Sequence, residues 1–301
     1  MVGGRRAAGL SESLQQSHLI AIGSITKTMT AAVVLQLAAE GRLGLDDPIA
    51  KHLPPRLYVS PDITIRQLLN HTSGVANYTG TSGLSQLIAA SPGHVFTADE
   101  LLNVIGPPRF LPGTATEYTN TAFLLAGQVA ERVGGTTIAE LYRSRLWLPT
   151  GLTATWLPGY GRAPGPVAMS LSSEGLIAPT DRMEVLSVGQ SAFGVMATAS
   201  DVARWGHALF TGSVVSGGMQ SEMRTLEPAA GNIPGESGSG LGIRAYDYLG
   251  RSQLGHSGAS AFGNSLLLHD IGARVTVVVL MNQASGADHF VLGPALLELA
   301  L

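Results

Sequence analysis

The amino-acid sequence predicts an α+β fold, with an antiparallel sheet flanked by helices and a second, helical region. Apolar residues recur at helical spacing through most of the chain up to Phe210. After Gly238 the period changes, and short apolar runs separated by turn residues indicate strands. A run of helices followed by a run of strands is typical of α+β proteins, because a parallel sheet would require the two kinds of element to alternate.

The longest predicted helix covers residues 25–40 and is apolar on nearly all sides, which indicates a buried central helix. Gly41 follows it directly, as is common at helix C-termini. We expect a loop rich in glycine, serine and threonine at 75–94 and an irregular segment rich in proline and glycine at 150–190. The remaining predicted helices are 62–70, 97–105, 120–133, 137–147, 201–210 with Ser200 or Asp201 as its cap, and 288–299.

The late part of the chain predicts the sheet. The stretch from Val275 to Met281 is its most apolar segment, and it is only as long as a strand. Four strands are expected, at 241–248, 252–256, 263–269 and 274–281, with a turn at 269–272 between the last two.

Composition excludes several classes of function. The chain has a net charge of −3 and 13% charged residues without long runs, so nothing suggests a nucleic-acid surface or an electrostatic membrane contact. It has no cysteine, which excludes disulfides, thiolate catalysis and cysteine-ligated metal. No spacing of histidine, aspartate and glutamate resembles a metal site. We therefore expect no cofactor, and a small-molecule or peptide substrate as partner, while the sequence sets no oligomeric state.

The first residues predict no targeting segment. Arg5 and Arg6 are not followed by an apolar run, and residues 7–17 are short and polar, which is typical of neither a signal peptide nor a transmembrane helix. As written, the chain is expected to be cytoplasmic. A true start farther upstream, with an export signal, would make it secreted or periplasmic.

Lys27 is one of only two lysines, the other being Lys51, and it stands three residues after Ser24 at the start of the central helix. Positions i and i+3 share one face of a helix. A buried lysine can lose its proton and act as a base, whereas arginine stays protonated. The pair therefore predicts a nucleophilic serine with its own activating base. The alternative is a serine that caps the helix and a solvated first-turn lysine.

Three further motifs follow in order. They are N-H-T-S-G at 70–74, Y-T-N at 118–120 and G-H-S-G-A at 255–259. Together with the serine and lysine, they resemble the serine β-lactamase and penicillin-binding protein superfamily, in its branch of class C β-lactamases, D-Ala-D-Ala carboxypeptidases and esterases. The resemblance runs from Gly23 to the last predicted strand.

The resemblance implies a β-lactamase/transpeptidase-like fold of two domains with the active site at their interface. Residues 1–23 and 199–301 would form the sheet domain, and residues 24–198 a mostly helical domain that carries the serine–lysine and Y-T-N motifs. Members of the family have an N-terminal helix and strands before the serine, but only 23 residues precede it here, and residues 15–23 would supply one short strand at most. Either the true start lies upstream, or the sheet is trimmed and exposes an edge.

The resemblance also implies an acyl-enzyme hydrolase with specific roles. Ser24 would attack a carbonyl carbon after Lys27 takes its proton, and Tyr118 would relay that proton to the leaving group. Asn120 would hold Lys27 and the substrate amide, in a position that also suits a helix N-cap.

On the late strand, the backbone N–H groups of Ala259 and Ser24 would form the oxyanion hole. Ser257, Gly258 and Ala259 would bind the substrate, and Gly258 would let the backbone approach it closely. His256 stands where β-lactamases of this branch carry the lysine of K-T-G, so it would give a weaker, pH-dependent positive charge. We therefore expect esters, thioesters or D-amino acid peptides as substrates before cephalosporins.

Two other residues have alternative interpretations. Arg244, upstream of His256, is a candidate cation for a substrate carboxylate, and equally a solvated strand residue. His71 in N-H-T-S-G is interpreted as structural support for the site, since that is the role of this loop in the family.

The leading interpretation of function is amide or ester hydrolysis of the D-Ala-D-Ala carboxypeptidase or β-lactamase kind. One alternative is a carboxylesterase or transacylase for a small metabolite, and another is a non-catalytic β-lactam or muropeptide sensor that keeps the serine. An α/β-hydrolase is a third, with Ser257 on a nucleophile elbow and Asp270 and His289 as partners.

Overall fold

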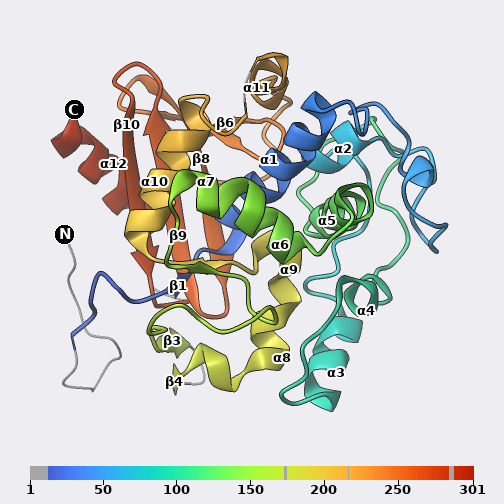
Figure 1. The fold of residues 1–301 in the computed structure, drawn as a ribbon, viewed down its shortest axis with the longest axis horizontal. Helices are drawn as coiled ribbons and strands as arrows, with labels where there is room; N and C mark the ends of the chain where they lie inside the picture. The colour runs from blue at the N-terminus through green and yellow to red at the C-terminus, as the bar shows by residue number, and fades with distance from the viewer. Residues whose placement is uncertain (1–12, 173–174, 216, 285–287) are drawn as a thin grey trace.

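The computed structural model describes residues 13–172, 175–215, 217–284 and 288–301 (Figure 1). It combines antiparallel sheets with helices that precede and flank them, which confirms the predicted α+β class. Arg5 and Arg6 lie outside the described residues. Within the described parts of the chain, no helix has the length and apolar character that crossing a bilayer requires.

The main sheet has five strands in the order β10-β9-β8-β7-β6, so each strand pairs antiparallel with its neighbour in sequence. Four of the strands were predicted, although β8 runs farther than expected, through residues 257–260. The strands are β6 (Glu236–Ser239), β7 (Arg244–Tyr248), β8 (Arg251–Ser260), β9 (Gly263–Asp270) and β10 (Val275–Met281).

Helices cover both faces of this sheet, because successive side chains of a strand point to opposite faces. Leu267 packs closely against Gly206 of α10 (Ala199–Phe210), whereas Leu266 meets Gly293 of α12 (His289–Ala300). Figure 1 shows α12 on the outer side of β10 and α10 on the inner side, toward the helical region.

The helical region is built around α1 (Thr26–Ala39), which is buried along most of its length as predicted. It packs mainly against α5 (Thr121–Gly134) and α9 (Gln190–Phe193) (Figure 1). One apolar core runs from these helices to β9 through Ile25, Leu124 and Leu267, and the proposed boundary between two domains stays a prediction. The other helices are α2 (Ile65–Leu69), α3 (Ser82–Ala90), α4 (Ala98–Leu102), α6 (Ile138–Tyr142), α7 (Leu148–Thr150), α8 (Met183–Leu186) and α11 (Gly218–Met223), with a π-helical turn, η3 (Arg143–Trp147), between α6 and α7.

The residues before the serine supply one short strand, β1 (Ile20–Ala21), but it does not join the main sheet. It pairs with β5 (Met196–Ala197), which also pairs with β2 (Thr155–Trp156), in a separate three-stranded sheet. Within the described residues, β10 has β9 as its one strand partner, so its other edge carries no strand.

Several local predictions were wrong. Residues 75–94 are not a continuous loop, because Thr81 accepts a hydrogen bond from the backbone of Leu84 and caps α3. The cap of α10 is Thr198, whose hydroxyl accepts from Asp201 N, and not Ser200 or Asp201. The 150–190 segment contains short elements, among them the hairpin of β3 (Ser170–Ser172) and β4 (Gly175–Ile177) and the 3₁₀ turns η4 (Pro179–Asp181) and η5 (Ser187–Gly189). Helix α11 and strand β6 were not predicted.

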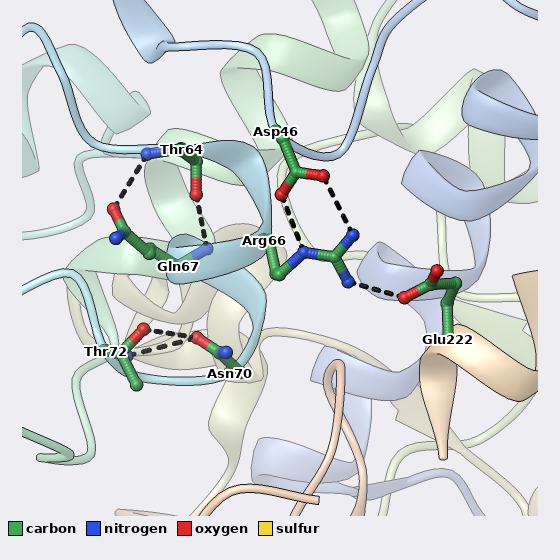
Figure 2. A network of polar contacts seen from close by, with 7 residues as sticks. All are labelled: Asp46, Thr64, Arg66, Gln67, Asn70, Thr72 and Glu222. Atoms are coloured by element: carbon green, nitrogen blue, oxygen red, sulfur yellow. Dashed lines mark hydrogen bonds and ion pairs between the residues drawn. The ribbon is translucent and has the colours of Figure 1, made fainter. Parts of the chain in front are cut away.

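A polar network fixes α2, which leads into the N-H-T-S-G motif (Figure 2). Arg66 donates to both oxygens of Asp46, at 2.8 and 3.1 Å, and to Glu222 Oε2 of α11 at 2.6 Å. Thr64 and Gln67 form a capping box at the start of α2. Helix α2 is therefore held in place just before the chain enters this motif.

Candidate active site

Ser24 lies in a 3₁₀ turn, η1 (Gly23–Ile25), that leads directly into α1. Its hydroxyl does not cap the helix, because neither helix start has a side-chain cap hydrogen bond. Gly23 has φ +52°, and a Cβ there would lie 2.7 Å from Ala259 N of β8. Only glycine fits this close backbone contact, so η1 sits directly on β8 and the serine is held near the C-terminal end of this central strand.

Lys27 is fully buried and its amine has three fixed partners. Nζ lies 2.6 Å from Asn120 Oδ1, 2.9 Å from the carbonyl oxygen of Ala192, and 3.2 Å from Ser24 Oγ. Burial, and then the positive charge of Arg244, lower the pKa of Lys27 well below its usual value.

These contacts define what the amine can do. A neutral amine has two N–H donors and one lone pair, and the oxygens of Asn120 and Ala192 can only accept. They therefore take both hydrogens and leave the lone pair for Ser24 Oγ. The solvated-lysine alternative is wrong, and the geometry suits a general base.

Tyr118 contacts the same serine, and its hydroxyl donates to Ser24 Oγ at 2.7 Å. Burial raises the pKa of Tyr118 to about 12, although the charge of Arg244 and the hydrogen bond to Ser24 oppose the rise. Its ring packs against His71, with centroids 4.5 Å apart, and His71 Nδ1 accepts a 3.3 Å hydrogen bond from Thr119 N. The N-H-T-S-G loop thus supports the tyrosine, as its structural interpretation requires.

Asn120 stands at the N-cap position of α5 but makes no side-chain cap hydrogen bond. Its Oδ1 accepts from Lys27, and its Nδ2 donates to Thr79 Oγ1 at 3.0 Å. The amide orientation is therefore set from both ends, and its oxygen is kept toward the lysine.

The G-H-S-G-A motif lies within β8 and pairs with β9 in continuous register. A Cβ on Gly258 would lie 2.2 Å from the carbonyl oxygen of Ile22, and Ser265 Oγ donates to that same oxygen at 2.7 Å. The glycine therefore allows the strand to meet the segment before Ser24, and it brings the backbone of Ala259 beside that of Gly23.

Comparison with known proteins identifies the family. The model of the family described as Beta-lactamase matches residues 2–301. The chain belongs to the Beta-lactamase family. This confirms the resemblance seen in the motifs, and with it an enzyme of the serine hydrolase class.

Its relatives in this family have varied names. Penicillin-binding protein 4* of Bacillus subtilis (strain 168) is 27% identical over 296 residues, covering 92% of this chain and 63% of the relative. Esterase EstB of Burkholderia gladioli is 33% identical over 165 residues, covering 49% of this chain and 42% of the relative. The structure of a D-stereospecific amidohydrolase from Streptomyces sp. is 30% identical with a TM-score of 0.79, covering 89% of this chain and 83% of that one. The chain thus spans less than two thirds of the length of these two curated relatives.

In this member of the family, the histidine of G-H-S-G-A carries no positive charge near neutral pH, which corrects the expectation from the sequence. Burial lowers the pKa of His256 well below its usual value, and the charges of Arg244 and Lys27 lower it further. Nδ1 lies 2.6 Å from the carbonyl oxygen of Ser257, which can only accept, so Nδ1 carries the proton of the neutral ring.

Arg244 differs from one of its two interpretations. It is not a solvated strand residue, because it is 4% exposed. It forms a buried ion pair with Glu236 of β6 through Nη1, and its buried Nε has no hydrogen-bond partner among the described residues, so contact with a substrate carboxylate stays a prediction. Its guanidinium carbon lies 4.9 Å from the centroid of the Tyr118 ring, so it still belongs to the site.

The α/β-hydrolase alternative is wrong. A nucleophile elbow needs a sharp turn from strand into helix, but β8 continues through Ser257 to Ser260 and pairs with β9 throughout. Asp270 binds Arg251 through two hydrogen bonds of 2.7 Å, far along the ladder from Ser257.

Two groups of the candidate site were not predicted from the sequence, the carbonyl of Ala192 and the side chain of Glu236. The carbonyl of Ala192 has no sequence signature, because every residue has one. Glu236 lies in a short polar strand without the alternation that predicts strands. Within the described parts of the chain, no group of three or more acidic or histidine residues is arranged to hold a metal ion.

Proposed function

We propose that this enzyme hydrolyses amide or ester bonds through an acyl-enzyme formed on Ser24. The observation that carries the proposal is the lysine amine, whose two hydrogens are directed to Asn120 and Ala192 while its third contact is Ser24 Oγ. A lysine in such surroundings is a base for the neighbouring hydroxyl.

The proton movements balance over one cycle. In acylation, Ser24 Oγ bonds to the carbonyl carbon, its proton passes to Lys27, and Tyr118 gives a proton to the leaving group as the scissile bond breaks. In deacylation, water attacks the acyl carbon and its proton restores Tyr118, while Lys27 returns a proton to Ser24 Oγ as that oxygen leaves. The opposite pKa shifts of the two groups suit these opposite roles.

The oxyanion of each tetrahedral intermediate would be stabilised by the backbone N–H groups of Ser24 and Ala259. The close approach of η1 to β8 supports this, because it brings the two backbone segments together. Such a donor typically contributes about 3 kcal/mol to transition-state stabilisation.

The names of the relatives favour substrates with a D-configured residue. Besides the Streptomyces amidohydrolase, D-aminopeptidases such as that of Brucella anthropi are 26% identical over 275 residues. A carboxylesterase is the second candidate, because the esterase shares the highest identity among the relatives described above, 33%. D-amino acid amides and small esters are therefore the first substrates to test.

The test is the intact mass of the protein after incubation with a fluorescent penicillin, with D-alanine amide and with p-nitrophenyl butyrate. We expect a transient acyl adduct that Ser24→Ala abolishes, together with a loss of turnover of at least ~10⁴-fold. Labelling that persists in this variant would contradict the proposal. A burst of adduct without turnover of any of the three compounds would identify a sensor instead.

A further inference from the structure

The carboxylate that holds Arg244 is built into the fold. The side chains of Arg244 and Glu236 are 5% and 1% exposed, and they lie on neighbouring strands β7 and β6. Ser239 Oγ donates to Glu236 Oε1 at 3.0 Å and accepts from Ala230 N at 3.1 Å. The carbonyl of Ala230 in turn accepts from Tyr118 N at 3.0 Å, so the ion pair is connected to the backbone of the site.

The pair lies beside Tyr118 and the G-H-S-G-A motif. Arg244 is opposite Gly255 in the register of β7 and β8, next to the G-H-S-G-A motif, and its guanidinium carbon is 4.9 Å from the ring of Tyr118. Tyr118 is the proposed proton donor to the leaving group, so a charge beside its ring acts on that part of the substrate.

No other described group near Tyr118 supplies a free cation. The amine of Lys27 is enclosed by its three partners, and His256 is neutral near neutral pH. Arg109 at the exposed rim pairs with Glu117 at 3.3 Å. Arg244 is therefore the positive charge that a substrate carboxylate would need, and it is already paired with Glu236.

We propose that Glu236 is a specificity-determining residue that makes this enzyme select substrates without a carboxylate on the leaving group. An entering carboxylate would have to lose its water beside a buried carboxylate of the same charge, and Arg244 could not pair fully with both. Amides and esters with neutral leaving groups meet no such cost. The proposal rests on the proposed hydrolase function and narrows its substrate class.

The test compares two esters that differ in one charge, 3-carboxyphenyl butyrate and its methyl ester. We expect the unmodified enzyme to prefer the methyl ester in kcat/KM by at least about tenfold, because like charges are brought together only in the other complex. Glu236→Gln keeps an oxygen acceptor and removes the charge. It should therefore raise kcat/KM for the carboxylate ester, relative to kcat/KM for the methyl ester, by at least about tenfold. The double variant with Arg244→Gln should lose that gain.

A matched control removes a carboxylate from an arginine pair elsewhere. Glu40, just beyond the far end of α1, binds Arg145 at 2.6 Å on the surface, and Glu40→Gln should leave the ratio unchanged. A preference of the unmodified enzyme for the carboxylate ester overturns the proposal, even if Glu236→Gln fails to fold. An unchanged ratio in a folded Glu236→Gln protein also overturns it.

If the protein is not a hydrolase, neither ester will be turned over, and this result differs from a failure of the Glu236 proposal alone. If neither ester is turned over, the relative binding of 3-carboxyphenylboronate and phenylboronate, measured by calorimetry, tests Glu236 without any turnover. The same preference for the neutral compound, and the same gain in Glu236→Gln, are expected. Equal binding of the two boronates to both proteins would overturn the role of Glu236.

Discussion

The helical and sheet sides of the site are constructed differently. On the helical side, Lys27 and Asn120 are side chains whose polar atoms have short, fixed hydrogen bonds. On the sheet side, β8 offers backbone and a neutral histidine, and Arg244 is held in a buried ion pair with Glu236. The difference suggests that the helical side determines the reaction and the sheet side determines which substrates undergo it.

The largest effect is expected on the helical side, from Lys27→Arg. The substitution replaces a titratable amine with a guanidinium that stays protonated and cannot accept the serine proton, so acylation should fall by about 10³–10⁴-fold in stopped-flow measurements. The matched control is Lys51→Arg, at the only other lysine, which is 59% exposed and pairs with Asp47. Near-normal acylation in Lys27→Arg would contradict the idea that the helical side determines the reaction.

The same base determines the acidic limb of the pH profile. A protonated Lys27 cannot accept the serine proton, so kcat/KM should fall as the pH drops through the pKa of Lys27. Because burial lowers that pKa, the limb should lie well below the usual lysine value of 10.5 and activity should persist toward neutral pH. A limb near the usual value would show that the amine is not buried in solution.

An intermediate effect is expected from Tyr118→Phe, and its size should depend on the leaving group. An amide nitrogen must be protonated before it leaves, so hydrolysis of D-alanine amide should fall by roughly 10²–10³-fold. p-Nitrophenolate leaves as a stable anion, so hydrolysis of p-nitrophenyl butyrate should fall by only about tenfold. Equal losses for both substrates would mean that Tyr118 orients the serine instead of donating the proton.

The smallest effect is expected on the sheet side, from His256→Asn. The pKa of His256 is held well below 6.5, so the ring does not titrate in the usual range. The pH profile of kcat/KM for a neutral ester should therefore show no inflection near pH 6.5 that depends on His256. An inflection near pH 6.5 that disappears in the variant would show that the histidine is charged during turnover.

The sequence predicted the parts of the molecule whose signals are local. The apolar period of α1, the spacing of Ser24 and Lys27, and the runs of β9 and β10 all lie within short windows. Family resemblance supplied Tyr118 and Asn120, which the structure brings to the same pair of residues. Their roles in catalysis stay predictions.

The missed parts depend on contacts between distant segments. Strand β6 is polar and contains a glycine, so it forms because β7 offers an edge and not because of its own pattern. The partner of Arg244 follows from that register, as does the charge state of His256, which depends on burial among segments far apart in the sequence. Helix α3 had a local signal, the cap at Thr81, but it lay in a segment whose small polar residues favour loops.

The backbone contact between Gly23 and Ala259 also bears on how the enzyme would lose activity under stress. The nucleophile lies on one side of this contact and the proposed oxyanion donor of β8 on the other, so a small separation would misalign them while every helix and strand remained intact. A displacement of about 1 Å can reduce the rate of an enzyme by roughly 10²-fold. Gentle heating or low denaturant should therefore abolish activity well before circular dichroism detects any unfolding. Turnover is then a more sensitive measure of the native structure than circular dichroism.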